Sequence, residues 1–386
     1  MSVRIVMLVS HPIQYYVPIY RTMAATPGIE LIVLYLCRAG IEKSYDPGFG
    51  KEIAWDIPLL DGYSHHFLSE HSDSGGINMR VLKAIRDIKP DVLISHGYDK
   101  PTNMLAIVGA RLMGIPVLIR SDTRLTDINL NPGYIKDKIK RFLFNLASGF
   151  IAIGTKNREF YKWNGVPDDK IYFAPFSVNN NFFYVDDSRR QLTRTETRNK
   201  MGIAHDACVV LSACKLIPIK RVQDAILAIA KIANSQPRVR LLLVGSGEME
   251  HELRALAHEL GLADIVLFAG FLNQSEMPSV YAASDMFVLA SEVEPWGLAV
   301  NEAMAGGLPC IVSDQVGCAV DLVDGKGTGV VYPCGNIDLL AQAIDGYVSN
   351  PNQLKEAANR AGELIKHWDN DVCANKIYTA CESVTC

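Results

Sequence analysis

The chain has 386 residues, of which 49% are hydrophobic and 21% are charged, and its mean hydropathy is +0.10. This length exceeds one ordinary hydrophobic core, so two domains are expected, and the formal net charge of −4 argues against broad nucleic-acid binding. The charge is uneven, because residues 1–185 hold 21 Lys and Arg against 17 Asp and Glu, whereas residues 186–386 hold 17 against 25. A basic first half would favour an acidic acceptor or an anionic membrane surface, and drift of surface charge explains it equally well.

The nine cysteines include no Cys-x-x-Cys pair, and several lie in apolar runs. Reduced, buried thiols in a cytoplasmic protein are therefore expected. The first apolar run is too short for a signal peptide, and no stretch approaches the roughly 18 apolar residues of a membrane-spanning helix. No metal site is expected either, since the one Asp-x-Asp pattern, at 369–371, is explained more simply as a helix cap.

Short runs rich in Val, Ile and Leu alternate with helical patterns along the chain. In the first half, strands are predicted at 4–10, 29–37, 91–96, 116–122 and 149–155, and helices at 16–25 and 78–90. After a polar stretch at 185–206, strands are predicted at 208–214, 239–247, 264–270, 286–291 and 309–314, with helices at 222–235 and 249–261. Continuous apolar runs, rather than strict alternation, favour parallel strands buried on both faces.

This alternation predicts an α/β fold of two doubly wound, Rossmann-like domains facing across a cleft. The polar stretch is the best candidate for the junction, which gives an N-terminal domain at 1–190 and a C-terminal domain at 205–367. In such sheets ligands bind beyond the carboxyl ends of the strands, so candidate site residues are sought there.

Two strand ends of the second domain suit a phosphate group. Lys215 and Lys220 follow the first strand and would converge on a diphosphate, or be two solvated loop lysines. Gly245 and Gly247 follow the next strand, where they would admit a ligand or allow tight packing between a strand and a helix.

A third strand end carries the most specific pattern. After the strand at 286–291, a Pro-Trp-Gly turn precedes a helix that begins near Leu298. The first N–H groups of this helix suit a phosphate. Glu302, one turn into the helix, could accept hydrogen bonds from a ribose diol, while Glu294 precedes the turn; an ordinary loop charge and helix charge are the alternative.

The segment from Leu211 to Pro309 resembles the donor-binding domain of family-four retaining glycosyltransferases with the GT-B fold. The stretch "SDMFVLASEVEPWGLAVNEAMAGGLPC" matches the family pattern around its Glu-x7-Glu pair, here Glu294 and Glu302. The family's cationic pair is matched by Lys215 and Lys220, its Val-Gly-x-Gly loop by residues 244–247, and its Phe-x-Gly strand end by residues 268–272. The sequence departs from the family in having Lys215 in place of Arg, and Pro-Trp in place of Gly-Phe in the turn.

The resemblance implies a UDP- or GDP-linked sugar as co-substrate, with no other cofactor. The two lysines would hold its diphosphate, Glu302 its ribose and Glu294 its sugar. Backbone contacts to phosphate, sugar and base would come from Gly245, Phe271, Leu272, Trp296, Gly297, Leu298 and Ala299. The final helix, about 368–386, would cross back onto the first domain.

The first domain would hold the acceptor. The resemblance places His96, after the strand at 91–96, beside the donor sugar, although a structural hydrogen bond is the alternative and the family's preceding His is Ile94 here. The acceptor side is predicted at His11, Gln14, Asp122 and Arg124, the last two of which could instead form an internal ion pair.

The resemblance implies a metal-independent retaining hexosyltransferase for surface glycan or polysaccharide synthesis, with His96, Glu294 and Lys220 as catalytic residues. The acceptor would be a glycan, a lipid-linked molecule or a small molecule. The basic segment at 133–149 would lie on the inner face of a membrane, or be a helix with an ordinary buried stripe. Two alternatives share the donor site: an epimerase would turn over the donor without an acceptor, and a sensor would bind it without releasing nucleotide.

Overall fold

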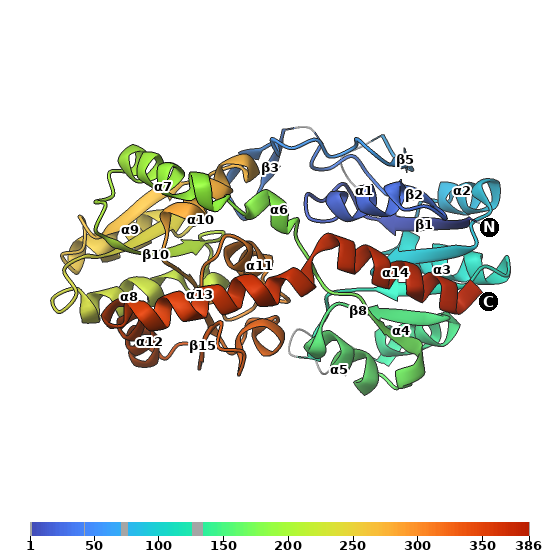
Figure 1. The fold of residues 1–386 in the computed structure, drawn as a ribbon. Helices are drawn as coiled ribbons and strands as arrows, with labels where there is room; N and C mark the ends of the chain where they lie inside the picture. Colours follow the sequence, from blue (N-terminus) through green and yellow to red (C-terminus); the bar gives the residue numbers. More distant parts are fainter. Residues whose placement is uncertain (1, 42, 71–75, 126–133, 386) are drawn as a thin grey trace. The chain divides into compact units, whose positions relative to one another are not determined.

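The computed structural model describes residues 2–41, 43–70, 76–125 and 134–385, and the chain divides into two compact units (Figure 1). The first unit comprises Met1–Ser44, Ile53–Ser177 and Asp369–Cys386, and the second comprises Tyr45–Glu52 and Val178–Trp368. Each unit contains one large parallel sheet with helices between its strands, so the predicted α/β class is confirmed.

The first unit is built on a seven-stranded sheet in the order β5-β2-β1-β6-β7-β8-β9. Along β1 (Val3–Val9), Ile5, Met7 and Val9 enter one apolar core with α1 and α14, while Val6 and Leu8 enter another with α2 and α3. The strands are β1 (Val3–Val9), β2 (Ile29–Tyr35), β5 (Ser64–Phe67), β6 (Val92–His96), β7 (Val117–Arg120), β8 (Gly149–Ala152) and β9 (Ile171–Phe173). The helices are α1 (Val17–Ala25), α2 (Arg80–Ile88), α3 (Pro101–Leu112), α4 (Tyr134–Leu146), α5 (Thr155–Trp163) and α14 (Asn370–Thr385).

The second unit is built on a six-stranded sheet in the order β12-β11-β10-β13-β14-β15. Its strands are β10 (Cys208–Ala213), β11 (Val239–Val244), β12 (Val266–Gly270), β13 (Met286–Leu289), β14 (Cys310–Ser313) and β15 (Gly329–Tyr332). Its helices are α6 (Asn180–Phe183), α7 (Asp187–Met201), α8 (Val222–Ile232), α9 (Glu250–Glu259), α10 (Met277–Ala283), α11 (Leu298–Ala305), α12 (Ile337–Ser349) and α13 (Pro351–Ile365). A short hairpin, β3 (Ser44–Asp46) and β4 (Lys51–Ile53), spans the residues that the second unit takes from the first half of the chain.

Both sheets reverse their strand order at one place, where the chain moves to the opposite side of the first strand. In the first unit this place lies between β1 and β6, and in the second it lies between β10 and β13. Connections leave in opposite directions there, so a crevice forms beyond the carboxyl ends of the two strands. The candidate residues after these strands are therefore positioned by the strand order.

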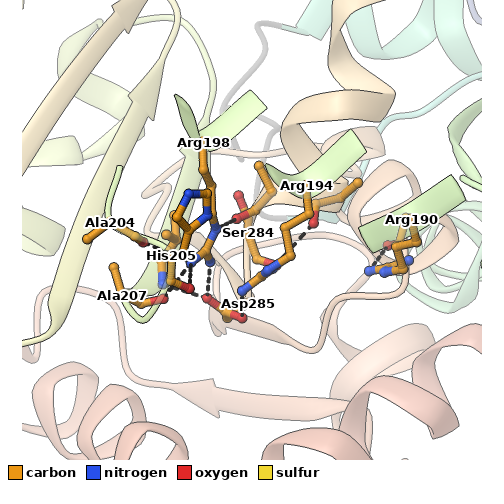
Figure 2. Close-up of polar contacts among 12 residues, drawn as sticks. Arg190, Arg194, Arg198, Ala204, His205, Ala207, Ser284 and Asp285 are labelled. Carbon is orange, nitrogen blue, oxygen red and sulfur yellow. Dashed lines mark hydrogen bonds and ion pairs between the residues drawn. The ribbon is translucent and has the colours of Figure 1, made fainter. Parts of the chain in front are cut away.

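The polar stretch at 185–206 forms helix α7 within the second unit, and the unit boundary lies instead at Ser177–Val178. Figure 2 shows Arg190, Arg194 and Arg198 one turn apart on α7, with Arg194 and Arg198 reaching the carbonyls and carboxylate around Ser284 and Asp285. Arg198 is 1% exposed and donates to Asp285 at 2.9 Å, and Arg190 donates to Gly306 at 2.8 Å. The helix thus packs through polar side chains, which a search for apolar runs does not detect.

Helix α14 returns to the first unit and packs on α1. The Asp369 carboxylate accepts the Asp371 N–H at 2.9 Å, which is the capping arrangement expected for this segment. The eight cysteines in the described part of the chain are unpaired, and five of them are buried.

We predict that Asp285→Ala lowers the free energy of unfolding by about 3–5 kcal/mol, because it leaves the buried Arg198 charge uncompensated. Urea unfolding measures this loss. The control is Asp338→Ala, which removes an exposed partner of Lys231 and should cost less than about 1 kcal/mol. Equal losses in the two variants would contradict the role given to Asp285.

Candidate active site

The centre of the candidate site in the second unit is an ion pair between Lys220 and Glu294. Lys220 ends a short 3-10 turn after β10, and Glu294 follows the neighbouring strand β13. The Lys220 Nζ lies 2.5 Å from the Glu294 Oε2, and only 15% and 14% of these side chains are exposed. Ser291 Oγ lies 3.3 Å from the same carboxylate oxygen. Residues 74 positions apart in the sequence thus meet where the strand order reverses.

Lys215 has a different carboxylate partner, Asp46 of the β3–β4 hairpin. Its Nζ lies 2.8 and 3.0 Å from the two Asp46 oxygens, and the Gly48 N–H donates to the same carboxylate at 2.8 Å. Burial acts to raise the pKa of Asp46, but Lys215 and the hairpin N–H groups outweigh burial and lower this pKa. Each predicted phosphate-binding lysine therefore holds a carboxylate, and neither Asp46 nor its hairpin was singled out in the sequence.

The same hairpin covers the residue predicted to meet the nucleotide base. The Phe49 ring packs edge-on against Phe271, with ring centroids 5.1 Å apart, and the Lys51 Nζ lies 4.3 Å from the Phe271 centroid. The Ser246 hydroxyl donates to the Phe49 carbonyl at 3.0 Å. Phe271 and Leu272 follow β12 and lie half-buried, so this edge of the second unit is aromatic and cationic.

Gly245 and Gly247 permit a close approach between two strand-end loops. A Cβ at Gly245 would lie 1.9 Å from the Cys214 carbonyl oxygen, and one at Gly247 would lie 2.3 Å from that of Leu216. The backbone also pairs here, since the Leu216 N–H donates to Ser246 at 2.9 Å. Tight packing within the unit thus requires both glycines, and it fixes the loop that carries Lys215.

The turn between β13 and α11 also depends on glycine. Gly297 has φ +100°, and a Cβ there would meet Val316, Leu289 and Glu294 at 3.0–3.3 Å. Leu298 and Ala299 are half-buried and form the first turn of the helix. The N–H groups of a first helical turn have no hydrogen-bond partner within the helix.

Two predicted donor-site residues are tied into the core. Glu302 is 5% exposed and accepts a hydrogen bond from the Tyr281 hydroxyl at 2.6 Å. Trp296 is 4% exposed, and its indole N–H donates to Asn301 at 2.9 Å. The carboxylate of Glu302 is therefore held in place by a buried tyrosine, and the Trp296 ring belongs to the core.

In the first unit, His96 lines a cavity of about 320 Å³ at the carboxyl ends of β1, β6 and β7. Burial, reinforced by the Arg120 charge, lowers the pKa of His96 to about 3, so this imidazole is neutral at pH 7. Of the predicted acceptor-side residues, Asp122 lines the same cavity. His11 instead lies 2.9 Å from Ser10 Oγ, and burial followed by the charge of Lys100 lowers its pKa.

The other two acceptor-side residues, Gln14 and Arg124, are 9% and 2% exposed and do not line the cavity. Arg120 does line it, at the end of β7, and was not selected from the sequence. The sequence did contain a signal for Arg120, because an Arg at the end of an apolar strand must either be paired or face a ligand.

Solved structures define the class of fold to which the chain is similar. HepE of Anabaena in complex with UDP superposes with a TM-score of 0.78, at 19% identity over 98% of this chain and 100% of that one. Sucrose-phosphate synthase of Thermosynechococcus elongatus gives 0.74, at 17% identity and 98% coverage of both chains. The two parallel-sheet units thus have the GT-B glycosyltransferase fold.

The sequence comparisons show which proteins the chain is similar to. Residues 193–364 match the model of glycosyl transferases group 1. Mannosylfructose-phosphate synthase of Agrobacterium fabrum is 34% identical over 65% of this chain and 54% of its own length. D-inositol 3-phosphate glycosyltransferase of Acidothermus cellulolyticus is 31% identical over 56% and 49%. The matches span about half the length of these relatives, and over that part the chain is similar to glycosyltransferases.

We predict that Asp46→Asn strengthens UDP binding roughly two- to five-fold, because the diphosphate no longer competes with a half-buried carboxylate for Lys215. Isothermal titration calorimetry measures the change. Glu52→Gln, which removes an exposed carboxylate from the same hairpin, is the charge-matched control. The prediction fails if the two variants bind UDP equally well.

Proposed function

We propose that the protein transfers a sugar from a nucleotide-diphosphate-sugar to an acceptor hydroxyl with retention of anomeric configuration and without a metal ion. The observation that carries this proposal is the Lys220–Glu294 pair beside the start of α11, at the point where the second sheet reverses its strand order. A cation and helix N–H groups suit a diphosphate, and an adjoining carboxylate suits sugar hydroxyls. Support for a UDP-linked donor comes from HepE, which was solved with UDP and with UDP-glucose.

The chemistry required of this site is stabilisation of a leaving group. As the bond between the anomeric carbon and the diphosphate oxygen breaks, negative charge grows on the diphosphate, and Lys220, Lys215 and the first N–H groups of α11 stabilise it. The acceptor oxygen forms its bond on the same face of the sugar, and its proton passes to the departing diphosphate oxygen. Glu294 would orient the sugar through its hydroxyls, and the neutral His96 would position a reactant by hydrogen bonding.

The ion pairs seen in the structure fit an exchange of partners on donor binding. Lys220 and Lys215 each hold a carboxylate, so their charges are compensated in the absence of the donor. A diphosphate that displaces these carboxylates would free Glu294 to accept sugar hydroxyls. The hydrogen bond from the buried Tyr281 would hold the Glu302 carboxylate in place for the ribose. A role in surface glycan or polysaccharide synthesis is proposed on the family resemblance alone.

The decisive test is activity in an isosteric variant. Glu294→Gln keeps the size of the side chain but loses its charge, and we expect kcat to fall at least about 100-fold, the scale of one electrostatic group in a site. Nucleotide release is measured with the donor that gives the largest shift in melting temperature among a panel of nucleotide-sugars. Lys231→Ala, in an exposed ion pair, is the control and should keep full activity. Full activity in Glu294→Gln would overturn the assignment of the site.

We also propose that α4 contacts an anionic membrane surface. Among the described residues, no helix has the length and apolar character needed to cross a bilayer. Leu143 and Phe144 supply the buried stripe of α4, but Ile139 and Phe142 are 40% and 54% exposed, and they adjoin exposed lysines at 136 and 138 and Arg141. Apolar side chains flanked by cations suit the headgroup region of an anionic bilayer. Residue 133 lies outside the described chain.

We predict that the protein sediments with vesicles of phosphatidylserine and phosphatidylcholine, and that Phe142→Ser reduces the bound fraction several-fold, because burial of this side chain is lost. Leu192→Ser, at a residue 60% exposed on α7, serves as the matched control. Equal binding by both variants would show that α4 is an ordinary surface helix.

A further inference from the structure

The cavity in the first unit contains a buried cation that no described carboxylate neutralises. Arg120 is 3% exposed, and its two Nη atoms lie 3.6 and 3.5 Å from Cys373 Sγ, a weak hydrogen-bond acceptor. The rings of Tyr16 and Phe176 also lie near it, with centroids 5.9 and 6.0 Å from the guanidinium carbon. The Arg120 Nε is buried without a hydrogen-bond partner among the described residues.

A second buried polar atom faces the same space. The His96 Nε2 has no hydrogen-bond partner among the described residues. His96 and Arg120 are paired in the register of the adjacent strands β6 and β7, so their side chains lie on the same face of the sheet, and both line the cavity. A buried polar atom without a hydrogen-bond partner destabilises the folded state, and an uncompensated buried charge destabilises it more. Two such atoms beside one cavity indicate that a ligand supplies their hydrogen-bond partner.

We propose that this cavity binds an oxyanion group, a phosphate or a carboxylate, carried by the acceptor molecule. The planar guanidinium matches the paired oxygens of either group, and the neutral His96 adds a hydrogen bond from a second direction. The cavity volume of about 320 Å³ is at the lower end of the range for small-molecule sites, which suits a group of monosaccharide size. Asp122, exposed on the lining, would accept a hydroxyl of the same ligand.

The inference rests on the proposed function only in calling this ligand the acceptor. It adds a substrate class, since the acceptor would be an acidic sugar or a phosphorylated small molecule rather than a neutral one. It also assigns Arg120 as the residue that determines this specificity, through a contact distinct from the donor lysines.

Melting temperatures of the full chain with inorganic phosphate and with acetate test the proposal, and UDP serves as the donor-site probe. We expect at least one of the two anions to stabilise the wild type and Lys220→Ala, and its Kd to rise at least tenfold in Arg120→Met. UDP should stabilise the wild type and Arg120→Met but not Lys220→Ala. The anion arm thus reports on this inference, and the UDP arm on the proposed function.

Three comparisons separate ligand binding from a structural role of Arg120. Without added anions, Arg120→Met should melt no lower than the wild type, because it removes an uncompensated charge. Lys100→Gln, which removes one positive charge near the cavity without lining it, should keep the anion response. Arg120→Lys retains the positive charge but lacks the planar guanidinium with its paired N–H donors, so it should recover only part of the affinity for the anion.

If Arg120→Met does not fold, the wild type alone still decides. We expect the ring resonances of His96 to shift on titration with phosphate or acetate. The proposal is overturned if neither anion stabilises the wild type or moves those resonances, or if Arg120→Met responds to the anions as the wild type does.

Discussion

The reversal of strand order in each parallel sheet is the constraint on which the candidate sites depend. Beside the first strand, connections leave in opposite directions, so the loops after β1 and β6, and after β10 and β13, separate and leave room for a ligand. Buried apolar strands hold this edge rigidly, while polar residues are concentrated in the loops just beyond it. Lys220 and Glu294, and likewise His96 and Arg120, are neighbours because their strands are neighbours.

The two units treat charge at this edge in different ways. In the second unit the lysines are neutralised by Glu294 and Asp46, so a diphosphate that binds them would displace these carboxylates. In the first unit Arg120 has a thiol and two aromatic rings as neighbours, so its charge remains uncompensated. The first arrangement favours reversible capture of an anion, and the second favours a site that is stable only when an anion is bound.

The long apolar strands and the helices beside them could be predicted, because strands that are buried on both faces consist of continuous runs of Val, Ile and Leu. The short strands β5, β9 and β15 were missed, since three or four residues carry too weak a pattern. Helix α7 was assigned to a junction because its packing uses arginines instead of apolar side chains. Lys220 and Glu294 were predicted from their motifs, whereas Arg120 was passed over in favour of Asp122 and Arg124.

The sequence by itself determined the α/β class and the strand ends that carry the candidate residues, Lys220 and Glu294 among them. Only the tertiary structure decided which groups neutralise one another. Asp46 reaches Lys215 across 169 residues, and a hairpin from the first half of the chain joins the second unit. Such ion-pair partners lie on segments that are far apart in the sequence, and no sequence pattern links these segments. Strand burial and glycine turns, in contrast, determine the residue types of a few consecutive positions, so the sequence shows them directly.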